Sequence, residues 1–81
     1  MQDANNEFLR DCALYVRGDI SEIKIKGKPA VAELFATTLS ESRKFFIALQ
    51  ENDLKKVLPL LEKKRAASKL LREKTGYVWP L

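Results

Sequence analysis

Residues 29–50 read PAVAELFATTLSESRKFFIALQ, and this stretch decides the fold. Its apolar and small residues recur every three or four positions: Val31, Leu34, Phe35, Thr38, Leu39, Ser42, Phe45, Phe46 and Leu49. That spacing places them on one broad face of a helix. Pro29 suits the first helical turn, where its missing N–H costs nothing. We therefore predict a central amphipathic helix over residues 29–51 that forms the centre of the core.

The chain after this helix predicts a second one, over residues 53–75. Asn52 and Asp53 supply an N-cap. Gly76 is suited to end the helix behind a lysine-rich last turn. An apolar stripe that begins at Leu54 stops after two turns, at Leu61, and another takes over, with the change of phase falling at Pro59. Since proline removes a helical hydrogen bond and clashes with the preceding turn, we expect a kink or a break near Leu58 and Pro59.

Residues 1–28 allow two predictions. One is a short helix from about Asn5 to Arg17, closed by Gly18. The other is a β-hairpin with arms 12–17 and 20–26, since glycine suits the first central position of a type II′ turn. The apolar–polar alternation of residues 22–26 favours a strand under either prediction. We favour the hairpin, preceded by a short helix.

The 81 residues predict a single domain of mainly α class, a helical hairpin that becomes α+β if the N-terminal β-hairpin forms. The two long helices are expected to pack through Leu34, Phe35, Phe45, Phe46, Leu49, Leu54, Leu58 and Leu61. The apolar stripe of residues 29–50 is wider than one partner helix needs. A chain this small with one cysteine has no disulfide to stabilise it. Both points predict a homodimer.

The residues that carry catalytic chemistry are few. The chain has no histidine, which is the usual general base and the commonest metal ligand. Cys12 lies among apolar neighbours and acids, which raise a thiol pKa, so we expect a buried structural cysteine. Glu33 and Glu41 are expected to be solvated surface charges. We predict no catalytic, cofactor or metal site, and therefore a protein that is not an enzyme.

Charge is distributed unevenly along the chain. Residues 1–22 carry five acids and two bases, whereas residues 53–76 carry eight bases and three acids. Arg65, Lys69 and Arg72 follow one another at helical spacing, and Lys63 and Lys64 lie beside them. Such rows of cations suit phosphates or acidic partners. This stretch has no asparagine or glutamine to read adenine edges, so nucleic-acid contact would be directed mainly to phosphates.

The C-terminal residues 76–81 form an apolar tail with the only tryptophan. Tyr77, Trp79 and Leu81 are candidate protein-interface residues, since exposed aromatics at a chain end often mark interaction sites. The alternatives are that the tail covers the core or docks on a second copy.

We expect a non-enzymatic adaptor or regulatory protein that acts by protein–protein interaction, as a homo-oligomer. The alternative is a nucleic-acid-binding protein that uses the basic C-terminal helix. No signal peptide and no stretch long enough to cross a bilayer are visible, so we expect a cytoplasmic protein without a membrane partner. A phage or viral origin is compatible with this size and composition.

Overall fold

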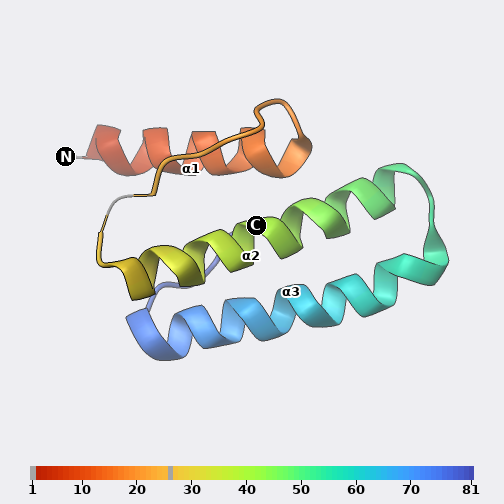
Figure 1. The fold of residues 1–81 in the computed structure, drawn as a ribbon. Coiled ribbons are helices and arrows are strands. Elements are labelled where there is room, and N and C mark those ends of the chain that lie inside the picture. The colour runs from red at the N-terminus through yellow and green to blue at the C-terminus, as the bar shows by residue number, and fades with distance from the viewer. Residues whose placement is uncertain (1, 26) are drawn as a thin grey trace.

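The computed structural model describes residues 2–25 and 27–81, with side chains from residue 7 onward. Three helices follow in order: α1 (Gln2–Arg17), α2 (Pro29–Gln50) and α3 (Leu54–Thr75). Helix α2 lies between the other two and packs on both (Figure 1). The predicted mainly α fold, with a helical hairpin at its centre, is therefore confirmed.

The core forms where α1, the connecting segment and the C-terminal tail meet α2. Cys12, Val16 and Leu39 are buried at its centre. Around them pack Phe8, Tyr15, Ile23, Ile25, Phe46, Trp79 and Leu81. The broad apolar face of α2 is thus covered within one chain, by α1 and the tail on one side and α3 on the other. The homodimer was predicted because this face is wider than one partner helix needs. Since α1, the tail and α3 of the same chain cover the face, its width is no longer an argument for a dimer.

The interface between α2 and α3 is built with small residues. Thr38 and Ala48 of α2 are buried, as is Leu71 of α3. The Thr38 hydroxyl donates to its own helix at the Leu34 carbonyl, 2.8 Å away, and lies 3.4 Å from the Ala67 carbonyl of α3. Short side chains at these positions let the two backbones approach closely.

The predicted β-hairpin was wrong, because Gly18 ends α1 instead of forming a type II′ turn. Gly18 has φ +86°. Its N–H donates to the Tyr15 carbonyl at 3.0 Å and the Asp19 N–H donates to the Leu14 carbonyl at 2.9 Å, which is the Schellman ending of a helix. Among the described residues none is in a strand, and Lys26, in the predicted second arm, lies outside them.

The connector, residues 18–25 of the described chain, turns at Gly18 and Asp19 and then runs back beside α1 without regular secondary structure (Figure 1). Ile23 and Ile25 turn toward the core, while Glu22 and Lys24 are exposed. The alternation that predicted a strand therefore records an extended segment buried on one side, without a β partner.

The turn between α2 and α3 uses Asn52 in the left-handed conformation, with φ +58°. The Asn52 N–H donates to the Leu49 carbonyl at 3.1 Å and the Asp53 N–H donates to the Ala48 carbonyl at 3.0 Å, again a Schellman ending. Asp53 occupies the N-cap position of α3 without a side-chain capping hydrogen bond. Its carboxylate lies 3.7 Å from the Lys56 ammonium instead.

The prediction of a break near Pro59 was also wrong, since α3 is one helix that contains this proline. The alternative of a kink there stays a prediction. Pro59 lies in the second turn on the exposed side, so only the Lys55 carbonyl loses its helical donor, and water can reach that side. A single continuous stripe faces α2: Val57, Leu60, Lys64, Ala67 and Leu71. The two apolar stripes seen in the sequence are therefore two faces of one helix.

Several predicted core residues lie on the surface. Leu54 is 73% exposed, Leu58 is 67% exposed and Leu49 is 46% exposed. Leu54 and Leu58 belong to the stripe that turns away from α2, because the α2–α3 interface is centred about a quarter turn further round the helix. The prediction that these three leucines pack in the helical hairpin was wrong.

Candidate functional site

The three cations predicted to form a row do so on α3. Arg65, Lys69 and Arg72 are all exposed, and their i, i+4, i+7 spacing places them along one side of the helix over about 10 Å. We call them the basic row. Within the described part of the chain, none of them has an acidic partner within ion-pair distance; the three ion pairs there involve Arg17, Lys44 and Lys56.

The structure separates Lys63 and Lys64 from this row. Lys63 is exposed but lies on nearly the opposite side of α3 from Arg65, because two residues rotate a helix by about 200°. The Lys64 ammonium lies 5.1 Å from the centre of the Phe45 ring, in the α2–α3 interface. Burial, followed by the nearby charge of Arg65, lowers the pKa of Lys64. Of the five predicted basic residues, three therefore share one surface.

Residues next to the basic row give it a mixed character that the sequence prediction missed. Glu62 and Glu73 are exposed, one helical turn from Arg65 and Lys69 respectively. Leu54 and Leu58 continue the same side of α3 toward its N-terminus. A signal was present in the sequence, since the side of α3 that begins with Leu54 and Leu58 continues with three cations and could not all be core.

The predicted interface residues of the tail are engaged within the chain. The Trp79 indole Nε1–H donates to the Ser42 hydroxyl at 2.9 Å, and Ser42 is buried. The Phe35 ring meets the edges of Tyr77 and Trp79, with ring centres 5.3 and 6.4 Å apart. Leu81 packs against the buried core cluster. The tail thus covers the core, and a partner reaches only the outer edges of these half-buried side chains.

Cys12 has the surroundings of a structural residue. Its side chain is fully buried. Burial, and to a smaller extent the negative charge of Asp11, raises the pKa of the Cys12 thiol to about 11. A nucleophilic cysteine needs a thiolate at neutral pH, and this thiol stays protonated there.

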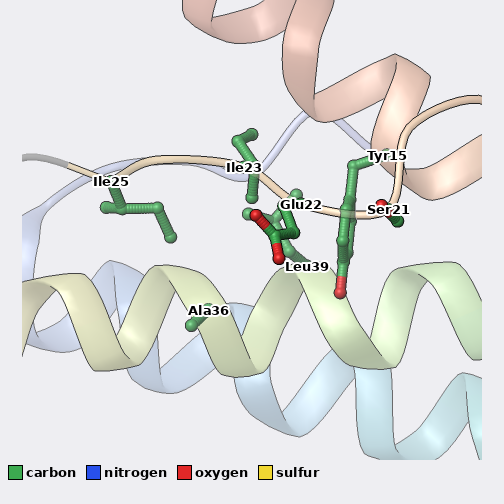
Figure 2. A pocket seen from close by; sticks show the side chains of 7 residues that line it. All are labelled: Tyr15, Ser21, Glu22, Ile23, Ile25, Ala36 and Leu39. Atoms are coloured by element: carbon green, nitrogen blue, oxygen red, sulfur yellow. The ribbon is translucent and has the colours of Figure 1, made fainter.

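A shallow hollow lies between α1, the connector and α2, on the side away from α3 (Figure 2). It has a volume of about 310 Å³, and its walls are mostly apolar. Figure 2 shows Tyr15 and Glu22 pointing toward α2 from α1 and the connector. Among the described residues that line the hollow, the Glu22 carboxylate and the Tyr15 phenol are the titratable groups.

The two other acidic candidates differ from each other. Glu33 is exposed, as predicted. Glu41 is half-buried, which corrects the prediction that it is solvated: one carboxylate oxygen lies 3.6 Å from the Lys44 ammonium and the other is buried without a hydrogen-bond partner. The reason is its position on α2 one turn before Phe45, at the edge of the α3 interface.

We also looked for a metal site, for a membrane-spanning helix and for similar known proteins. In the described part of the chain, no cluster of cysteine, aspartate and glutamate is suited to a metal ion. None of the helices described is apolar over a length that could span a bilayer. No protein-family model, curated protein or solved structure matches the chain.

Proposed function

We propose that the protein is a non-enzymatic adaptor or regulatory protein that binds an acidic segment of another protein along the basic row. The observation that carries this proposal is the exposure of Arg65, Lys69 and Arg72 on one side of α3 without acidic partners among the described residues. Other cations of the same helix are engaged, as Lys56 is with Asp53 and Lys64 is with Phe45.

Glu62 and Glu73 favour a protein partner over a nucleic acid. Each lies one turn from a member of the row, where it repels phosphate but can pair with a lysine or arginine of a partner protein. Interspersed charges of both signs set the register of protein interfaces. The aromatic rings of the tail pack within the chain, Trp79 on the core cluster and both Tyr77 and Trp79 on Phe35, so their faces are not free to stack on bases.

Nucleic acid is the second candidate, and the same row favours it, because three unpaired cations at one-turn spacing can each neutralise a phosphate. Three such contacts predict a binding constant that falls about 40-fold between 50 and 200 mM salt. Binding would be only weakly dependent on sequence.

The test compares two triple variants that lose the same charge. One removes the row (Arg65→Ala, Lys69→Ala, Arg72→Ala), and the other removes three lysines of the opposite side of α3 (Lys56→Ala, Lys63→Ala, Lys74→Ala). Displayed peptide libraries are selected on the wild-type protein, and the affinities of enriched peptides are measured for all three proteins. We expect acidic peptides whose affinity falls at least about 5-fold for the row variant and little for the control.

Two results would contradict the proposal. Enriched peptides without acidic residues, or equal losses in both variants, would show that the row is not the binding surface. A random DNA duplex, titrated in parallel by fluorescence anisotropy, tests the second candidate. Duplex binding with the steep salt dependence above, lost only in the row variant, would assign the row to nucleic acid instead.

A further inference from the structure

Two leucines on the N-terminal half of α3 are largely exposed to solvent. Leu54 and Leu58 are one turn apart and share one side of the helix, and about 73% and 67% of their surfaces are exposed. Isolated exposed leucines are ordinary, but adjacent ones on a well-formed helix make an apolar patch that favours burial.

The charges on either side of this patch are arranged so that two copies of it can complement each other. Lys55 lies three residues before Leu58, and Glu62 lies four residues after it; both are exposed and neither is in an ion pair of the described chain. Suppose that a second α3 packs antiparallel about a two-fold axis at Leu58. A residue that follows Leu58 by a given number of positions in one copy then faces the residue that precedes Leu58 by the same number in the other copy. Glu62 of one copy then lies beside Leu54 and Lys55 of the other, and symmetry makes this contact twice.

We infer that a second copy of this chain packs on the N-terminal half of α3, as an antiparallel two-fold dimer centred on Leu58. A parallel arrangement is disfavoured because it sets Lys55 against Lys55 and Glu62 against Glu62. The antiparallel one buries four leucines between two pairs of opposite charges. It does not depend on the proposed function, because the basic row begins beyond the overlap.

The size of the patch predicts a weak dimer. The whole chain exposes 6116 Å², and stable protein interfaces bury about 800 Å² from each partner. A contact restricted to residues 54–62 is smaller than that and belongs with transient interfaces. Self-association should therefore depend on concentration, from micromolar to millimolar.

A dimer of this kind would carry two basic rows. The centre of each row, Lys69, lies eleven residues from the axis, so the two centres lie about 33 Å apart along the paired helices. Such an adaptor is bivalent, and its avidity for a partner with two acidic segments would exceed that of one row.

The test is sedimentation equilibrium of the full chain across this concentration range. Leu58→Glu places two carboxylates at the axis and should raise the dimer dissociation constant at least about tenfold. Leu70→Glu is the matched control, since Leu70 is a 44% exposed leucine on the other side of α3 and should leave association unchanged. Circular dichroism confirms that each variant folds.

A charge swap tests the geometry separately from the leucines. Lys55→Glu alone and Glu62→Lys alone should each weaken the dimer, and the double variant should restore it. A protein that stays monomeric throughout, a dimer indifferent to Leu58→Glu, or a swap that does not restore association would overturn the inference. The row variant (Arg65→Ala, Lys69→Ala, Arg72→Ala) should still dimerise, so failure of the dimer and failure of the proposed function give different results.

Discussion

Replacing Trp79 by phenylalanine should destabilise the fold by about 1–3 kcal/mol. Phenylalanine keeps an aromatic ring against Phe35 but cannot donate to the Ser42 hydroxyl, which is only 1% exposed. A buried polar group that loses its partner costs about that much, because water cannot replace the donor. A domain of 81 residues has a total stability of about 4–12 kcal/mol, so the change is a large fraction of it.

Urea unfolding followed by far-ultraviolet circular dichroism measures this effect, since the variant has no tryptophan fluorescence. The unfolding midpoint should fall by about 1–2 M. Ser42→Ala should cost less, because Trp79 is half-buried and water can reach its N–H. The double variant should cost less than the sum of the singles, by about 0.5–1.5 kcal/mol.

Val78→Ala is the control, because Val78 lies in the same tail and is 67% exposed. It should change the free energy of unfolding by less than about 0.5 kcal/mol. If Trp79→Phe were equally silent, or if the effects of Trp79→Phe and Ser42→Ala simply added, the hydrogen bond would not hold the tail on the core.

Three further predictions concern α1 and α3. The Cys12 thiol, with its pKa raised from 9.0 to about 11, contributes stability that is full below pH 9 and is lost as the pH rises toward 11. Urea titrations should show a decline about 2–3 kcal/mol larger in the wild type than in Cys12→Ala, in which the half-buried Tyr77 phenol still ionises at high pH, and parallel pH profiles would contradict it. Pro59→Ala restores a donor to the Lys55 carbonyl and should raise the melting temperature by about 4–8 °C, measured by calorimetry; a lower one would show that the proline favours this helix start. Gly76→Ala should cost about 1 kcal/mol in urea titrations, because Gly76 has φ +78° while an added Cβ meets no atom within 4 Å. An unchanged midpoint would mean that α3 does not end in the left-handed conformation.

The sequence was sufficient for the elements whose signal is long and local. The stretch 29–50 repeats its apolar positions over six turns, which only a helix satisfies. The signals at residues 12–26 were ambiguous, because a glycine with positive φ ends a helix as well as it forms a hairpin turn. Ile23 and Ile25 alternate with polar residues whether the segment pairs in a sheet or lies one-sided on a core. Only tertiary packing separates these cases.

The candidate site divides in the same way. The basic row follows from helical spacing alone, so the sequence predicts it. Lys64 lies over the Phe45 ring and not in the basic row. This contact depends on how α3 is aligned along α2, which a local sequence pattern does not determine. The bond from Trp79 to Ser42 joins residues 37 positions apart, and for that reason the tail could be read as an interface or as a cover.

The ring cluster around Phe35 also constrains the order in which the chain folds. Phe35 contacts Phe8 of α1 as well as the tail, so the first helix shares its docking site with Tyr77 and Trp79, which the ribosome adds only after α3. The α2–α3 hairpin needs only neighbouring sequence and can form early. During synthesis α1 therefore meets an uncovered apolar surface, and its stable attachment waits for the tail. A nascent chain arrested before residue 77 should expose this surface to chaperones, whereas a chain that includes residues 77–81 should not.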